Sequence, residues 1–152
     1  MRKTQKRAGL LVAVELGAEW PDAALGGRFD AVRRVVAQME GESPEAFAAR
    51  LGALAGRLFT DRTELRDAVV ACNERTDPAA SSARRSIGSA LLGRIGPGGT
   101  FVLAAGPRAG GRLRHALSGL ALSLATQASA NVTVHFGNEG EEPCERAIAR
   151  VA

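Results

Sequence analysis

The chain has 152 residues, of which 45% are hydrophobic and 24% are charged. This length suits one domain with its own core, and the composition is that of an ordinary globular protein. No apolar stretch approaches the roughly 18–20 residues that a membrane-spanning helix needs, so the sequence predicts no membrane association.

The high isoelectric point, about 10.0, comes from one end of the chain. Of 20 basic residues, Arg2, Lys3, Lys6 and Arg7 lie in the first seven, and without them 16 basic residues face 16 acidic ones. We therefore expect a disordered basic tail over residues 1–8, with weak, salt-sensitive attraction to polyanions. Aromatic residues make up only 4% of the chain, which offers no stacking platform for nucleic acid.

The cysteines and the amino-terminal segment favour a cytoplasmic protein. Cys72 and Cys144 stand apart with no CxxC pair, as a reducing compartment allows, and they predict no zinc site. Glu15 interrupts the apolar run that follows the basic start, so the segment does not match a signal peptide.

The first half of the chain predicts two strands and a helix. Residues 9–16 form an apolar run typical of a buried strand, and a long connection follows over residues 17–30. Residues 31–39 fit a strand or a helix, and their valines favour the strand. Ser43-Pro44 is a helix start, with serine as the N-cap, and predicts a helix over residues 44–59.

The second half alternates strands and helices. Residues 65–72 predict a strand, and Asp77-Pro78 starts a helix whose buried face carries Ile87, Leu91 and Ile95. We expect Gly-Pro-Gly-Gly at 96–99 to end that helix. A strand over 100–105, a helix over 110–128, a strand over 131–136 and an acidic tail over 138–152 complete the chain.

This order predicts one α/β domain over residues 9–137. Strands that alternate with helices of this length form right-handed crossovers. The sequence therefore predicts a mostly parallel five-stranded sheet with helices on both faces.

Candidate binding residues follow the strands, because ligands of parallel sheets bind at the carboxyl ends of the strands. Glu15 follows the first strand, and Asn73 and Arg75 follow the strand at 65–72. The loop after residue 105 is the best candidate for anion binding, since glycines allow close approach to backbone N–H groups at a helix start and two arginines flank them. Its candidate residues are Gly106, Arg108, Gly110, Gly111 and Arg112.

This loop departs from the common phosphate motifs. Gly106 and Gly111 have Walker A spacing, but Arg112 and Leu113 stand where lysine and Ser/Thr are needed, and the loop is not GxGxxG. The alternative interpretation is that its glycines only shape a tight corner between strand and helix.

Gly106-x2-Ala109-x9-Gly119 after a strand resembles the Gly-x2-Gly-x9-Gly-Ser/Thr loop of universal stress proteins, and residues 10–16, LLVAVEL, resemble that family's first strand. The resemblance implies a nucleotide or phosphate ligand. Ala109 replaces the second glycine, Leu120 the Ser/Thr, and Glu15 the aspartate that ends the first strand. These departures favour a member that does not bind ATP.

No coherent catalytic set is visible. Cys72 and His115 lack an acid that would orient the histidine, and Arg33-Arg34 and Arg84-Arg85 are most simply solvated faces. We therefore expect a non-catalytic ligand-binding or regulatory domain. The alternative is a protein-interaction or assembly module, such as a homodimer, that uses Trp20, the 17–30 loop and the tails; a phosphate-handling enzyme using Arg75, Arg108 and Arg112 is a third hypothesis.

Overall fold

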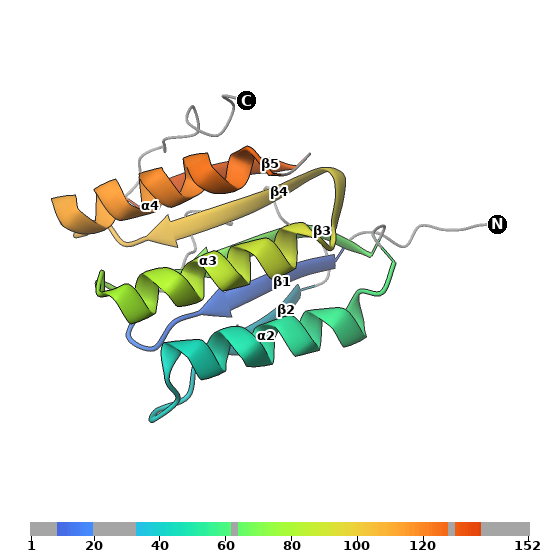
Figure 1. Cartoon of the computed structure of the whole chain (residues 1–152), viewed down its shortest axis with the longest axis horizontal. Coiled ribbons are helices and arrows are strands. Elements are labelled where there is room, and N and C mark those ends of the chain that lie inside the picture. Colours follow the sequence, from blue (N-terminus) through green and yellow to red (C-terminus); the bar gives the residue numbers. More distant parts are fainter. Residues whose placement is uncertain (1–8, 20–32, 62–63, 128–129, 138–152) are drawn as a thin grey trace.

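The computed structural model contains a five-stranded sheet whose strands are all parallel (Figure 1). It describes residues 9–19, 33–61, 64–127 and 130–137. The sheet has the order β2-β1-β3-β4-β5. Its strands are β1 (Gly9–Val14), β2 (Arg33–Ala37), β3 (Leu65–Ala71), β4 (Ile95–Ala105) and β5 (Asn131–Phe136). The predicted α/β class and parallel sheet are confirmed, and residues 33–37 form a strand, as their valines predicted.

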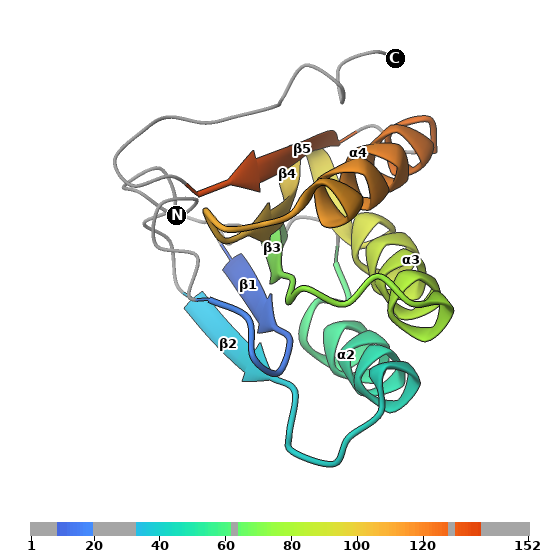
Figure 2. The same ribbon diagram turned by 90° about the vertical axis from the view of Figure 1, so that its left-hand side faces the viewer.

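Three helices connect the strands and lie side by side on one face of the sheet (Figure 2). They are α2 (Pro44–Leu58), α3 (Pro78–Leu92) and α4 (Gly111–Ala125). The sequence predicted helices on both faces of the sheet, whereas the helices among the described residues all lie on one face. Residues 20–32, between β1 and β2, and the predicted tails at 1–8 and 138–152 lie outside the described residues.

Both faces of the central strands are buried, which explains their continuous apolar sequences. Leu11 and Val70 belong to the cluster that packs against the helices, whereas Leu10, Val12 and Val69 belong to the cluster on the opposite face. Each of these side chains is at most 1% exposed. The core therefore extends to both sides of the sheet.

Side-chain caps begin two of the helices where the sequence predicted them. Ser43 Oγ accepts a hydrogen bond of 3.0 Å from the Ala46 N–H, and Asp77 Oδ1 accepts one of 2.9 Å from the Ala80 N–H. A proline occupies the first turn in both cases, where its missing N–H costs no hydrogen bond. These caps place the starts of α2 and α3 beside the carboxyl ends of the strands.

The predicted end of α3 is wrong by several residues. The helix ends at Leu92 with Gly93 as its C-cap, and Ile95 begins β4 instead of closing the apolar face of the helix. Residues 96–99 form an irregularity within β4, because Leu65 pairs with Ile95 while Asp67 pairs with Thr100. Gly98 has φ +89°, and a Cβ on Gly99 would collide with the Arg66 carbonyl oxygen. The glycines serve this bulge in the strand and not a helix terminus.

An ion pair covers part of the free edge of β2. Gln38 N–H donates to the Val14 carbonyl of β1, so the backbone groups of Ala37 and Met39 face away from the sheet. Arg50 donates to the Ala37 carbonyl at 2.8 Å, and Glu42 Oε1 accepts from the Met39 N–H at 3.0 Å. The Arg50 and Glu42 side chains also bond each other at 2.8 and 2.7 Å. We call these two residues the edge pair.

We expect the edge pair to make stability pH-dependent. Its hydrogen bond from Arg50, and then the Met39 N–H, lower the pKa of Glu42 from 4.5 to about 2. A lowered carboxyl pKa stabilises the fold above the ordinary value, and that contribution disappears as the pH falls from 4.5 through about 2. For this partly exposed pair we expect about 1 kcal/mol at pH 7.

Urea unfolding of wild type and Glu42→Gln at pH 7, 4, 3 and 2 measures this contribution. The difference in free energy of unfolding should shrink through the acidic range and vanish at its lower end. Glu40→Gln, on the same loop and exposed, is the control and should change stability by less than about 0.5 kcal/mol. A difference between wild type and Glu42→Gln that does not change with pH would contradict the assignment.

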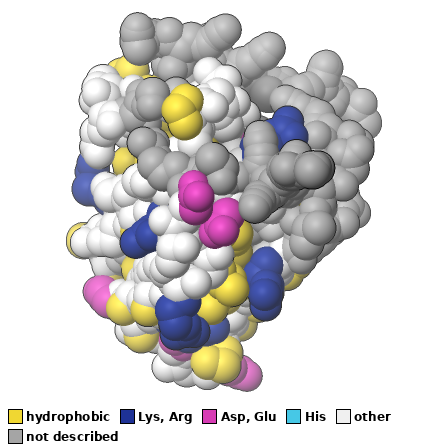
Figure 3. Space-filling model, turned by 90° about the vertical axis from the view of Figure 1, so that its right-hand side faces the viewer, with side chains coloured by type: hydrophobic (Ala, Val, Ile, Leu, Met, Phe, Trp, Pro, Cys, Tyr) yellow, Lys and Arg dark blue, Asp and Glu magenta, His cyan; other side chains and the backbone are white. Residues whose placement is uncertain are grey.

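Charges are interspersed at the end of the molecule where the strands begin (Figure 3). The arginine side chains visible on this face lie among acidic and uncharged ones and do not gather in one patch. The described residues visible on this face therefore form no contiguous basic patch of the kind that binds nucleic acid.

Candidate functional site

Two predicted site residues, Glu15 and Asn73, meet at the carboxyl ends of the adjacent strands β1 and β3. Glu15 Oε1 accepts a hydrogen bond of 2.8 Å from the Asn73 N–H, and Asn73 Nδ2 donates to the Leu16 carbonyl at 2.9 Å. The chain continues from β1 to β2 on one side of this point in the sheet and from β3 to β4 on the other. Open α/β sheets usually bind ligands at such a point, where successive connections lead in opposite directions.

Arg84 of α3 fills this point in the fold. Its guanidinium donates to both carboxylate oxygens of Glu15 at 2.7 Å, to Asn73 Oδ1 at 3.0 Å and to the Arg75 carbonyl at 2.8 Å. Arg84 is 2% exposed and Glu15 is 7% exposed. The prediction of a solvated face was therefore wrong for Arg84, whereas Arg85 is exposed as predicted.

The helical spacing contained a signal for this buried arginine. Arg84 lies four residues after Ala80 and three before Ile87, so it shares the buried face of α3 with them. A buried arginine needs a carboxylate partner, and Glu15 stands at the end of an otherwise apolar strand. The pair could be inferred only by combining these two observations.

The Arg84 network fills most of the space beside Glu15 among the described residues. Burial alone would lower the pKa of Arg84, but the hydrogen bonds and charge of Glu15 outweigh burial and raise it. The cavity lined by Glu15, Gln38, Asn73 and Arg75 holds only about 10 Å³, enough for a single water molecule. Glu15 and Asn73 therefore serve the structure of this edge.

Arg75 is exposed and fixes the loop between β3 and α3. The Arg75 guanidinium donates to Asp77 Oδ2 at 2.9 and 2.5 Å, and the backbone N–H of Arg75 donates to Asn73 Oδ1 at 2.9 Å. Among the proposed residues of a phosphate-handling enzyme, Arg75 is thus held within the loop after β3. Arg108 lies in the loop after β4, and Arg112 lies in the first turn of α4.

The loop between β4 and α4 is held from its inner side. Ala109 N–H donates to the Gly106 carbonyl at 3.1 Å, and Arg114 Nε donates to the Ala109 carbonyl at 3.0 Å. The Arg114 guanidinium also stacks 4.4 Å from the centre of the Phe136 ring of β5. These contacts fix the loop while Arg108 and Arg112 stay exposed.

The fold does not require glycine at the start of α4. Gly106, Gly110 and Gly111 all lack positive φ, which is confined among the described residues to Gly17, Gly41 and Gly98. A Cβ at Gly110 or Gly111 would meet nothing within 4 Å, and the atoms nearest to one at Gly106 would be those of the Glu19 carboxylate, at the end of a flexible side chain. The interpretation that these glycines shape a tight corner therefore has no support at 110 and 111.

The first turn of α4 presents its backbone to solvent. Gly110 is the N-cap and supplies no side-chain hydrogen bond, so the N–H groups of Gly111, Arg112 and Leu113 have no partner among the described residues. Aligned peptide dipoles give this end of the helix a positive potential. Backbone donors and two exposed arginines, Arg108 and Arg112, thus lie within one short segment at the carboxyl edge of the sheet.

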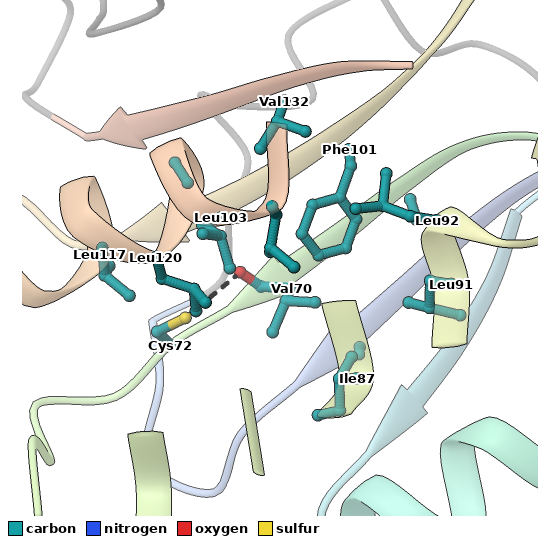
Figure 4. Packing of buried hydrophobic residues seen from close by; sticks show 14 of the residues in the cluster. Val70, Cys72, Ile87, Leu91, Leu92, Phe101, Leu103, Leu117, Leu120 and Val132 are labelled. Atoms are coloured by element: carbon teal, nitrogen blue, oxygen red, sulfur yellow. Dashed lines mark hydrogen bonds between the residues drawn. The ribbon is translucent and has the colours of Figure 1, made fainter. Parts of the chain in front are cut away.

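Cys72 and His115 do not form a catalytic pair in this structure. Cys72 is 3% exposed beneath Leu103, Leu117 and Leu120, and its Sγ points at the Val70 carbonyl 3.6 Å away (Figure 4). Burial, followed by the nearby Glu15 charge, raises the pKa of the thiol well above its ordinary value. His115 is exposed on α4. The described residues also contain no cluster of three or more His, Cys, Asp or Glu residues able to hold a metal ion.

Neither the predicted interaction loop nor the comparisons with known proteins assign a function to this chain. Trp20 and residues 20–30 of the predicted interaction loop lie outside the described residues. Among the described helices, none is both long and apolar enough to cross a bilayer. No family model, curated protein or solved structure matches this chain significantly.

Proposed function

We propose that this α/β domain is a non-catalytic module that binds a phosphate-bearing ligand at the start of α4. The observation that carries the proposal is the first turn of α4, where three backbone N–H groups have no partner among the described residues and the exposed Arg108 and Arg112 lie close by in the sequence. Such a turn supplies both hydrogen-bond donors and positive potential to an anion. The bare Gly110 and Gly111 allow that anion to approach the backbone closely.

The geometry favours recognition of the phosphate group over recognition of a whole nucleotide. Glu15, which stands where universal stress proteins have an acidic residue, is engaged by Arg84 and Asn73. Ala109 is buried and its carbonyl is bound by Arg114. We therefore expect AMP and ATP to bind with affinities close to that of inorganic phosphate. A distinct preference for either nucleotide would favour the universal-stress-like form of the proposal.

Two substitutions at Gly111 test the site without removing a charge. Proline is well tolerated at the first helical position but has no N–H, so Gly111→Pro deletes one donor and preserves the helix start. Gly111→Ala keeps the donor and meets no neighbour. The binding of inorganic phosphate can be measured by titration and followed by amide NMR shifts. Wild type and Gly111→Ala should bind phosphate at millimolar concentration, and Gly111→Pro should bind it about tenfold more weakly.

Charge removal gives the second arm of this experiment. Arg108→Ala with Arg112→Ala should weaken phosphate binding at least about tenfold, since hydrogen bonds to charged groups contribute about 1.5–3 kcal/mol each. Arg57→Ala, at the far end of α2, removes an exposed arginine away from the site and should leave the affinity unchanged. Equal affinities for all of these variants, or no shifts at residues 110–113, would refute the proposal.

A further inference from the structure

A groove of about 300 Å³ lies between α3 and α4, which run side by side in Figures 1 and 2. The helices touch closely toward their carboxyl ends, where a Cβ on Gly88 would come within 2.6 Å of Leu124 Cδ1. The residues that line the groove all precede this contact along the two helices; they are Ser81, Arg84, Arg85, His115, Ala116, Leu117, Gly119 and Leu120.

The walls of the groove combine apolar side chains with an arginine and a histidine. Leu117 and Leu120 are buried and form an apolar floor, whereas Arg85 and His115 are exposed at the rim. None of the described residues that line the groove is acidic. Arg84 is neutralised by Glu15, and Asp77, at the start of α3, is engaged by Arg75 and the Ala80 N–H.

Arg85, at the rim of the groove, has donors left for a ligand. Within the described residues, Arg85 has a single hydrogen bond, from Nη1 to Ser123 Oγ at 3.1 Å, and no carboxylate partner. Its planar guanidinium can therefore still bind a carboxylate with two parallel hydrogen bonds. Gly119 leaves space in the groove, since a Cβ there would meet nothing within 4 Å.

We propose that this groove binds a small amphipathic carboxylate, with its apolar body on Leu117 and Leu120 and its charged group beside Arg85 and His115. The volume is at the lower end of the range for small-molecule sites, which favours a compact ligand. Charge complementarity selects the anion, and the buried leucines select the apolar body. This site is separate from the proposed phosphate site in its residues and its ligand class.

Octanoate, 1-octanol and acetate serve as probes, because they separate the apolar and charged parts of the ligand. We expect octanoate to shift the amide NMR signals of residues 81–85 and 115–120 in a saturable manner at millimolar concentration. 1-Octanol should bind at least about tenfold more weakly and acetate should produce no saturable shift. Equal affinity for octanoate and 1-octanol, or shifts outside the groove, would overturn the proposal.

Two variants locate the site. Gly119→Phe should fill the groove and abolish octanoate binding, whereas Gly119→Ala should retain it. Both variants replace a glycine inside α4 by a residue with higher helix propensity. Arg85→Gln should bind octanoate about tenfold more weakly. Undiminished binding by Gly119→Phe or Arg85→Gln would refute the assignment. Gly111→Pro should bind octanoate as wild type does, so failure of the phosphate proposal and failure of this one remain distinguishable.

Discussion

Replacement of Arg84 by methionine should lower the free energy of unfolding by about 3–5 kcal/mol, because it leaves a buried carboxylate without its partner. Glu15 is 7% exposed and would keep only the Asn73 N–H among its present donors. The Arg75 carbonyl would also lose its donor. This loss is a large fraction of the roughly 5–15 kcal/mol that stabilises a typical domain. Urea unfolding at pH 7 measures the change.

The neighbouring residue provides a matched control for this substitution. Arg85→Met changes the same residue type on the exposed side of α3 and should cost less than about 0.5 kcal/mol. Glu15→Met combined with Arg84→Met removes both charges and should be more stable than Arg84→Met alone. Arg84→Lys keeps the charge without the planar fork and should lie between wild type and Arg84→Met. Equal losses for Arg84→Met and Arg85→Met would contradict the role of the pair.

Cys72 should react with a thiol reagent at least about a thousandfold more slowly in the native protein than in the urea-unfolded chain. The thiolate is the reactive form, and burial holds the pKa of this thiol well above its usual range. Leu103, Leu117 and Leu120 also cover the sulfur (Figure 4). Reaction therefore requires opening of the packing between α4 and the sheet.

The Cys144→Ser variant isolates this signal, because it leaves Cys72 as the one remaining thiol. The reaction of 5,5′-dithiobis-(2-nitrobenzoate) with this variant, followed by absorbance, gives the rate in buffer and in urea. Addition of Arg84→Met should accelerate the native reaction, and the logarithm of its rate should rise in proportion to the lost free energy of unfolding. A native rate close to the unfolded rate would show that the thiol is accessible in the folded protein.

The fold was predictable because its signals are local. Runs of apolar residues marked the strands, and Ser43-Pro44 and Asp77-Pro78 marked two helix starts through their caps. The wrong end of α3 arose from glycines that serve a bulge within β4, at Gly98 and Gly99. A glycine cluster looks alike in both settings, and only the pairing of Ile95 with Leu65 distinguishes them.

The candidate site was only partly predictable because its contacts are distant in sequence. The rule that ligands bind at strand ends correctly brought Glu15 and Asn73 together. It did not show that Arg84, 69 residues after Glu15, occupies the position of a ligand. The strand-to-helix turn before α4 could be placed from the sequence alone, since a turn and its helix are adjacent in the chain, and ligand binding there stays a prediction.

The edge pair takes the place of a neighbouring strand beside the end of β2. Arg50 supplies a donor to the Ala37 carbonyl and Glu42 an acceptor to the Met39 N–H, which is the hydrogen bonding that a sixth strand would provide there. Because both groups are already satisfied, a second polypeptide cannot extend the sheet past β2 at these residues without first displacing the ion pair. Val35 and Met39 remain 46% and 56% exposed beside this edge. A partner that approaches β2 at residues 37–39 with the pair intact must therefore recognise side chains and not backbone.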